Sequence, residues 1–173
     1  MSSNKRSFIP LEIAVLTISD TRTEADDKSG KILCDRLSDA GHTIHEKMIV
    51  TDDIYQVRAA VSAWIAKEKP DVVLTTGGTG VTGRDGTPEA IRPLLDKEIT
   101  GFGEMFRVLS FETIKTSTLQ SRAFAGVANR TYIFCLPGSA GACAEAWDKL
   151  ISHQLDYRSR PCNLVELMPR LNE

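Results

Sequence analysis

The sequence lacks the features that are typical of nucleic-acid-binding and membrane-spanning proteins. Its 21 basic and 23 acidic residues are well mixed and give a formal net charge of −2. No basic run is longer than Lys5-Arg6, so the sequence predicts no electrostatic surface for a nucleic acid or a lipid headgroup. No apolar segment approaches the roughly 20 residues that cross a bilayer. These absences favour a small-molecule partner, with no nucleic acid and no membrane.

Metal-binding and disulfide patterns are also missing. The sequence has four cysteines and three histidines, without a C-x-x-C pair or a histidine at metal-ligand spacing. These residues are Cys34, Cys135, Cys143, Cys162, His42, His45 and His153. We therefore expect reduced thiols at core positions, histidines with surface or packing roles, and no zinc site.

The beginning of the sequence only partly resembles a secretory signal. Lys5 and Arg6 precede an apolar stretch, but Glu12 interrupts it, and Ile13–Leu16 is too short for the apolar core of a signal peptide. We therefore expect a cytoplasmic protein. At 173 residues the chain is long enough for one domain with its own core, so we expect an N-terminal extension over residues 1–10 and a single domain over residues 11–173.

Predicted strands and helices alternate along the sequence, which indicates an α/β fold. The near-continuous apolar run Ile13–Ile18 is typical of a parallel strand that is covered on both faces. Further strands are expected over residues 43–50, 72–75 and 132–136, and helices over residues 28–40, 53–69, 88–95, 103–113 and 142–155. Residues 115–121 read as a polar stretch and residues 122–128 as a small-residue segment.

The segment Leu74–Ala90, LTTGGTGVTGRDGTPEA, predicts a phosphate-binding loop. It follows a short apolar strand, and its glycines allow the backbone amides to approach an anion closely. Thr87, Pro88 and Glu89 predict the start of a helix, with Thr87 as its cap.

Two known motifs match this loop only in part. Gly78–Gly83 satisfies G-x-G-x-x-G, the basis of an alternative reading as a nicotinamide-dependent dehydrogenase. However, this motif requires a helix that begins within the glycines, and here the predicted helix begins only at Thr87. It also requires an acidic residue at the end of the next strand, but Glu98, at about the right distance, lies in a predicted helix and its C-terminal end. The same glycines fit half of a P-loop, but Arg84 and Asp85 replace the required Lys and hydroxyl residue. The loop therefore indicates phosphate and a metal, in a different arrangement.

Polar or glycine-rich turns follow four predicted strands. Because the carboxyl ends of parallel strands share one edge of a sheet, we expect these turns to line a single crevice. They comprise Ser19-Asp20, Val50-Thr51-Asp52, Thr75–Gly80 and Pro137–Ser139.

Several segments in this order resemble the MoaB/MogA family of molybdenum-cofactor biosynthesis proteins, and the resemblance spans nearly the whole chain. They are TTGGTG with RDGTPEA, GFGEMFR, STLQSRA and LPGS. Phe8-Ile9-Pro10, Ser110-Phe111-Glu112, residues 116–122 and Arg160–Asn163 are most similar to the MoaB branch. The resemblance implies an α/β three-layer sandwich around a mostly parallel sheet. It also implies trimers or hexamers that bind molybdopterin, and other molybdenum-cofactor biosynthesis proteins as further partners.

The resemblance also implies a reaction and its residues. MogA-type members adenylylate molybdopterin with Mg-ATP. The family pattern places the two important carboxylates at Asp52 and Asp85, which we expect to be catalytic and to position Mg²⁺. The expected pterin- and nucleotide-binding residues are Ser19, Asp20, Thr75, Thr76, Gly77, Gly78, Thr79, Gly80, Arg84, Glu104, Ser117, Thr118, Pro137, Gly138 and Ser139.

Five alternatives stay open in the sequence. Asp52 or Asp53 could instead cap the helix that begins there, and Glu104 could be an ordinary exposed residue. The turn Leu136–Ala140 departs from the LPGxP of MogA-type proteins, so the adenylyltransferase stands beside a non-catalytic oligomer that stores or hands on molybdopterin. The apolar side chains of Phe102, Met105, Phe106, Val108 and Leu109 fit either an oligomer contact or a core helix. The choice between molybdenum and tungsten stays open too.

Overall fold

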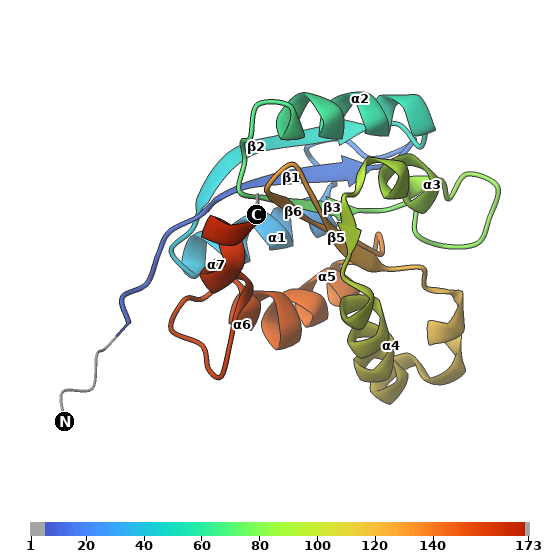
Figure 1. Ribbon diagram of the computed structural model, residues 1–173. Coiled ribbons are helices and arrows are strands. Elements are labelled where there is room, and N and C mark those ends of the chain that lie inside the picture. Colours follow the sequence, from blue (N-terminus) through green and yellow to red (C-terminus); the bar gives the residue numbers. More distant parts are fainter. Residues whose placement is uncertain (1–5, 172–173) are drawn as a thin grey trace.

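Six strands form one mixed sheet in the order β2-β1-β3-β6-β5-β4 in the computed structural model, which describes residues 6–171 (Figure 1). The strands are β1 (Glu12–Ile18), β2 (Thr43–Val50), β3 (Val72–Thr76), β4 (Lys97–Glu98), β5 (Phe124–Ala128) and β6 (Thr131–Leu136). Strands β2, β1, β3 and β6 run parallel, whereas β5 is antiparallel to β6 and β4 is antiparallel to β5. The predicted mostly parallel sheet is confirmed.

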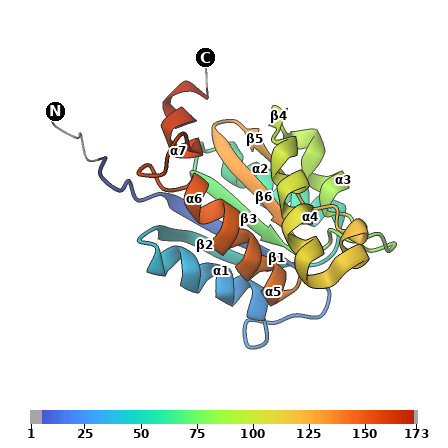
Figure 2. The same ribbon diagram turned by 90° about the horizontal axis from the view of Figure 1, so that it is seen from below.

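Helices cover both faces of this sheet. The α-helices are α1 (Lys28–Asp39), α2 (Ile54–Ile65), α3 (Thr87–Ile91), α4 (Thr100–Ile114), α5 (Ala140–Ala146), α6 (Ser152–Gln154) and α7 (Leu164–Leu167). One apolar core joins one face of the sheet to α1, α4 and α5, and a second core joins the other face to α2 and α3. Figure 2 shows the first of these helical layers in front of the sheet. The fold is the predicted three-layer α/β sandwich.

Burial explains the sequence of the central strands. Every residue of β3 is buried, as in β5 and β6, because helices cover both faces. Strand β2 lies at one edge of the sheet and is at least partly exposed throughout, so its sequence is more polar. The edge position therefore accounts for the polar residues of β2.

The segment before β6 differs from the prediction. Residues 124–128 form the buried strand β5, and Glu98 belongs to the short strand β4 that pairs with it. The sequence does not predict these strands, because Phe124–Ala128 contains mainly small residues with a low strand propensity. Its pairing with β6 and β4 stabilises it as a strand. The polar stretch forms η2 (Lys115–Gln120), a 3₁₀ helix.

Helix boundaries also differ in detail. Asp53 caps α2, and its carboxylate accepts hydrogen bonds from the amides of Tyr55 and Gln56 at 2.9 Å each. Thr87 is the first residue of α3 and not its cap; the cap position is Gly86. The last predicted helix is divided into α5, a π-helical turn η3 (Trp147–Ile151) and α6. The structure adds α7 near the end of the described residues.

The cysteines follow the prediction with one exception. Cys34, Cys135 and Cys143 are buried free thiols, but Cys162 is exposed, because it lies in a loop outside the two cores. Of the predicted N-terminal extension, residues 1–5 lie outside the described part of the chain. Within the described residues, no helix is long and apolar enough to span a bilayer.

Candidate functional site

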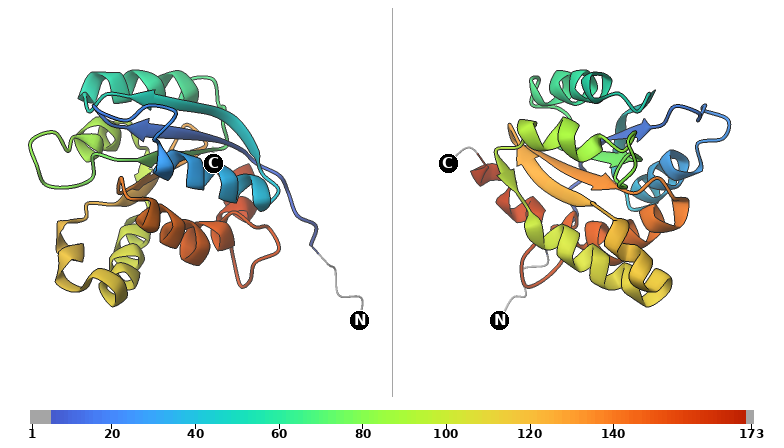
Figure 3. Two further views of the ribbon diagram at one scale, coloured as in Figure 1. Left: turned by 180° about the vertical axis from the view of Figure 1, so that it is seen from behind. Right: turned by 90° about the vertical axis from the view of Figure 1, so that its right-hand side faces the viewer.

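A cavity of about 590 Å³ lies at the carboxyl ends of the parallel strands. Its lining comes from the segments that follow β1, β2, β3 and β6, together with the starts of α1 and α5 and one side of α4 and η2. Figure 3 (right) views the molecule from this side. The parallel register places the ends of the four strands close together, since Ile18 pairs with Val50, Thr17 with Thr76, and Thr76 with Leu136.

The first part of the glycine loop turns sharply against the sheet. Gly77 and Gly78 have φ values of +111° and +64°, which disfavour residues with a side chain. A Cβ on Gly77 would lie 2.1 Å from the carbonyl oxygen of Ile18, and one on Gly78 would lie 2.4 Å from the hydroxyl of Thr87. Thr87 donates from this hydroxyl to the Gly77 carbonyl at 2.8 Å. Thr87 therefore holds the loop rather than capping a helix.

Asp85 closes the outer part of the loop. Its Oδ2 accepts a hydrogen bond from the amide of Thr82 at 2.8 Å and another from the Thr82 hydroxyl. Burial opposes ionisation of Asp85, but these bonds and one from the Gly80 amide outweigh it and lower its pKa. The carboxylate is therefore ionised and fixed in place beside Gly80 at neutral pH.

Asp52 approaches the same cavity from the end of β2. Its Oδ2 accepts the amide hydrogen of Asp20 at 2.9 Å, while its own amide donates to Asp20 Oδ1 at 3.0 Å. Its Oδ1 lies 3.3 Å from the position that a Cβ on Gly78 would take. Burial is the main cause that raises the pKa of Asp52, helped by the negative charges of Asp20 and Asp85.

Asp20 and Arg84 form an ion pair at the rim. Arg84 donates from Nε and Nη2 to the two carboxylate oxygens of Asp20, at 2.9 and 2.7 Å. This pairing lowers the pKa of Asp20 and raises that of Arg84. Because the arginine side chain is 64% exposed, the pair contributes little to stability, but it joins the first loop to the glycine loop.

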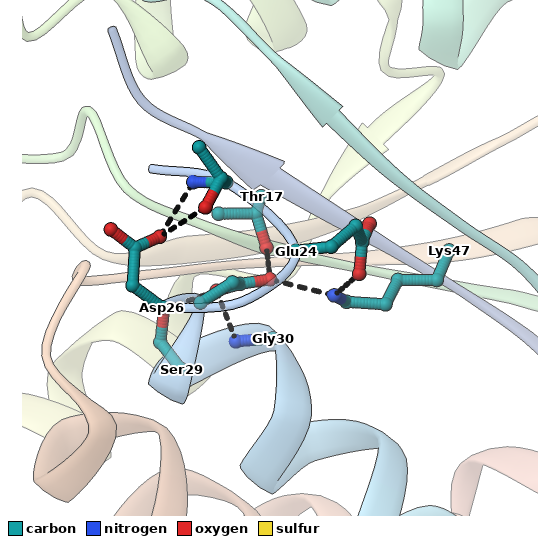
Figure 4. A network of polar contacts seen from close by, with 8 residues as sticks. Thr17, Glu24, Asp26, Ser29, Gly30 and Lys47 are labelled. Atoms are coloured by element: carbon teal, nitrogen blue, oxygen red, sulfur yellow. Dashed lines mark hydrogen bonds and ion pairs between the residues drawn. The ribbon is translucent and has the colours of Figure 1, made fainter. Parts of the chain in front are cut away.

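A buried polar network supports one wall of the cavity (Figure 4). Asp27 accepts hydrogen bonds from the Thr17 hydroxyl at 2.8 Å and the Gly30 amide at 2.9 Å, and it pairs with Lys47 at 3.1 Å. Burial opposes ionisation of Asp27, but these partners outweigh it and lower its pKa. Thr17 and Ser29, which both contact Asp27, also line the cavity. The network therefore fixes the start of α1 against β1.

Most of the residues predicted for the site line this cavity. They are Ser19, Asp52, Thr76, Gly77, Gly78, Thr79, Gly80, Arg84, Asp85, Pro137, Gly138 and Ser139. They come from four segments that are far apart in the sequence, as the shared-edge argument predicts. Their contribution to binding or catalysis stays a prediction.

Five predicted residues lie elsewhere. Thr75 is buried in β3, and the Thr118 hydroxyl donates to the Arg107 carbonyl at 3.3 Å. Glu104 and Ser117 are exposed, and Asp20 borders the cavity through its contacts with Asp52 and Arg84. None of these five lines the cavity itself.

The structure adds lining residues that the sequence did not reveal. On the side of the strand ends, the glycine loop and the starts of α1 and α5, the added residues are Thr17, Ile18, Arg22, Ser29, Thr82 and Ala142. On the opposite side, which we call the far wall, they are Phe106, Ser110, Ile114, Gln120 and Ser121. The far wall comes from α4, η2 and the link to β5. Phe106, Ser110, Gln120 and Ser121 lie in segments that carry the family resemblance, but no local pattern predicted their approach to the glycine loop, because this approach depends on how α4 packs.

The oxygen ligands in the cavity fit a magnesium-bound phosphate. Mg²⁺ prefers oxygen ligands and is usually held by one or two carboxylates together with phosphate oxygens and water. Asp52 and Asp85 are two such carboxylates beside the glycines. In the part of the chain that the structure describes, no group of three or more His, Cys, Asp or Glu residues is suited to a metal.

The fold and the site define an α/β protein with a glycine-lined polar cavity at the carboxyl edge of its parallel sheet. The family model described as a probable molybdopterin binding domain matches residues 14–157. The chain belongs to this family of molybdenum-cofactor biosynthesis proteins, and within it to the MoaB/MogA proteins, as the resemblance predicted.

Individual relatives agree with this assignment. Molybdenum cofactor biosynthesis protein B of Escherichia coli (strain K12) is 57% identical over 163 residues, which cover 94% of this chain and 96% of that protein. A crystal structure of a molybdenum cofactor biosynthesis protein B has a TM-score of 0.83 and 48% identity, covering 87% of this chain and 94% of the other. The tungsten cofactor synthesizing protein MoaB from Pyrococcus furiosus has a TM-score of 0.79 and 34% identity, covering 95% and 98%.

Proposed function

We propose that the protein binds molybdopterin in the described cavity and adenylylates it with Mg-ATP in the cytoplasm. The observation that carries this proposal is the convergence of Asp52 and Asp85 on the glycine turn. These carboxylates come from different loops, and they lie beside Gly78 and Gly80 respectively. Two acids next to the backbone amides would repel a phosphate that binds alone. They suit a polyphosphate that binds together with Mg²⁺, because the carboxylates hold the metal ion.

The proposed transfer needs no protein nucleophile. An oxygen of the pterin phosphate attacks the α-phosphorus of ATP, and the bond from that phosphorus to the β-phosphate bridging oxygen breaks. Pyrophosphate leaves with the bonding electron pair, and AMP stays linked to the pterin phosphate. The residues of this chain would align the two phosphates and hold the Mg²⁺ that neutralises their charge, and alignment with charge neutralisation is the main requirement of such transfers.

The roles of the residues follow from their positions. The backbone amides of Gly78 and Thr79 would bind phosphate oxygens, whereas those of Gly77 and Gly80 already donate to the Leu136 carbonyl and to Asp85. Asp52 and Asp85 would hold Mg²⁺, which supplies charge neutralisation when bound. Phe106 and Ile114 offer an apolar wall against which a flat ring system would pack. Ser139 caps α5 by accepting the Ala142 amide hydrogen at 3.2 Å, which places the amino end of that helix at the cavity.

A single-turnover assay with molybdopterin, Mg²⁺ and α-labelled ATP tests the proposal. We expect AMP-linked pterin and pyrophosphate from the unmodified protein. We expect Asp85→Asn to lower the rate about 100-fold or more, because it removes a charge that acts in the transition state. Glu104→Gln is the matched control, because Glu104 is exposed and outside the cavity. Undiminished product with Asp85→Asn would contradict the role of this carboxylate.

The non-catalytic alternative predicts a different outcome of the same assay. Tight molybdopterin binding without labelled product would identify a carrier that stores or hands on the pterin. Absence of both binding and product would reject the whole proposal. Asp52→Asn separates the carboxylates: if Asp52 acts on Mg²⁺, raising the Mg²⁺ concentration should partly restore the rate.

We also propose that the protein assembles as a homo-oligomer. Phe102 and Phe106 are buried, but Met105 and Val108 on the same helix are 50% and 60% exposed. Phe111, about one turn after Val108, is also exposed, so Met105, Val108 and Phe111 lie within about a third of the helix circumference. Such a surface favours contact with another protein. Sedimentation equilibrium would distinguish a trimer or hexamer from a monomer, and a monomer at all concentrations would contradict the proposal.

A further inference from the structure

A second cavity of about 410 Å³ adjoins the first, and Ser121 lines both. Three arginines line it: Arg92 of η1 (Arg92–Leu94), Arg107 of α4, and Arg122 in the link between η2 and β5. These elements lie at the same end of the molecule, where Figure 2 shows α3 and α4. The proposed adenylylation assigns no role to this cavity.

The three guanidinium groups are held by different contacts. Arg92 lies 4.8 Å over the ring of Phe124 and pairs with Glu98 at 3.1 Å. Arg107 donates to the carbonyl oxygen of Ala123 at 3.1 Å. A Cβ on Gly103 would lie only 3.0 Å from Arg107 Nη1, so this glycine lets the guanidinium lie close to the helix. The cavity is therefore built around positioned cations.

Arg122 is held most firmly. Its Nε donates to the Gly80 carbonyl at 2.7 Å and its Nη2 to the Asp85 carbonyl at 2.6 Å, while Nη1 pairs with Glu89. Arg122 therefore connects the second cavity directly to the glycine loop of the first.

Charge compensation in this cavity is incomplete. Glu89 faces Arg122 and Glu98 faces Arg92, so two carboxylates oppose three guanidinium groups. Arg107 contacts a neutral carbonyl, and its charge has no carboxylate partner among the described residues. A guanidinium has five N–H donors in a planar fork that matches two oxygens of a phosphate or sulfate. The arrangement is suited to an oxyanion and unsuited to a cation.

We propose that this arginine cavity, defined by Arg92, Arg107, Arg122 and Ser121, binds an oxyanion of the phosphate class. The anion can come from two sources. One is free inorganic pyrophosphate or phosphate. The other is the terminal phosphates of a nucleotide in the first cavity, and this second source rests on the proposed function. Because Arg122 also holds Gly80 and Asp85, an anion bound here stabilises the outer part of the glycine loop.

Titration calorimetry at constant ionic strength tests this proposal with pyrophosphate, ATP and AMP as separate probes. Arg107→Ala removes the uncompensated cation and leaves the lining of the first cavity intact. Arg158→Ala is the matched control, since Arg158 pairs with Asp156 and lies outside both cavities. We expect Arg107→Ala to weaken pyrophosphate or ATP binding about tenfold, as loss of a charged hydrogen bond does.

The pattern of losses identifies the source of the anion. Weaker pyrophosphate binding with unchanged ATP binding supports a free anion, and weaker ATP binding with unchanged AMP binding supports the terminal phosphates. Equal affinities of the Arg107→Ala, Arg158→Ala and unmodified proteins for all probes would overturn the proposal, as would absence of pyrophosphate and ATP binding. If Arg107→Ala unfolds, Arg92→Ala replaces it. These outcomes do not depend on turnover, so failure of adenylylation would be recognised separately.

Discussion

The two halves of the glycine loop are held by different physical means. Gly77 and Gly78 form an inner half that is fixed by the backbone, through positive φ angles and close contact with Ile18 and Thr87. The outer half, residues 81–86, is more exposed, and side chains fix it. The outer half thus depends on Asp85 and Arg122, and the inner half depends on the absence of a Cβ. The loop therefore combines a turn fixed by its backbone with one fixed by side chains, next to the same cavity.

Gly77→Ala should have the largest effect. The new Cβ would lie 2.1 Å from the Ile18 carbonyl at a φ of +111°, so the change should destabilise the protein by about 2–4 kcal/mol. Urea unfolding measures this loss. Gly83→Ala is the matched control in the outer half, because nothing lies within 4 Å of its added Cβ. Equal destabilisation by the two changes would contradict the distinction between the halves.

Arg122→Ala should have an intermediate effect, concentrated in the outer half. It removes the bonds to the carbonyls of Gly80 and Asp85, which contribute about 1–2 kcal/mol in total after solvent replaces them. Hydrogen exchange should become faster for the amides of residues 81–86, while those of β3 keep their protection. Arg130→Ala, which breaks a different arginine–glutamate pair, serves as the control. Unchanged exchange in the outer half would mean that Arg122 does not fix it.

The smallest expected effect is a difference in pH dependence between the carboxyl groups of Asp52 and Asp85. The pKa of Asp85 is lowered and that of Asp52 is raised, so acidification should protonate Asp52 first. A lowered pKa means that the contribution of Asp85 to stability is present above its unfolded pKa and is lost as the pH falls through its folded pKa. Asp52 has the opposite sign, because its contribution is present below its unfolded pKa and is lost as the pH rises through its folded pKa. NMR titration of the side-chain carboxyl groups measures both, and the reverse order would contradict these environments.

The sequence revealed the inner half of the loop better than its surroundings. The glycines and the strand before them are local signals, and the prediction of four strand ends at one edge agrees with the parallel register. Thr87 shows where a local rule failed. A threonine before proline predicts a helix cap, but its hydroxyl instead donates to the Gly77 carbonyl, a partner that only the folded loop supplies.

By itself the sequence determined the α/β class, the four parallel strands, the glycine-rich loop after the third of them, and the family. Each of these depends on periodicity, turn residues or motifs that are contiguous in the chain. Only the tertiary structure decided that Phe124–Ala128 is a strand, that α4 supplies the far wall, and that Arg122 joins two cavities. The reason is that these features depend on contacts between residues far apart in sequence. A guanidinium that binds Gly80, 42 positions away, leaves no local pattern from which its role could be predicted.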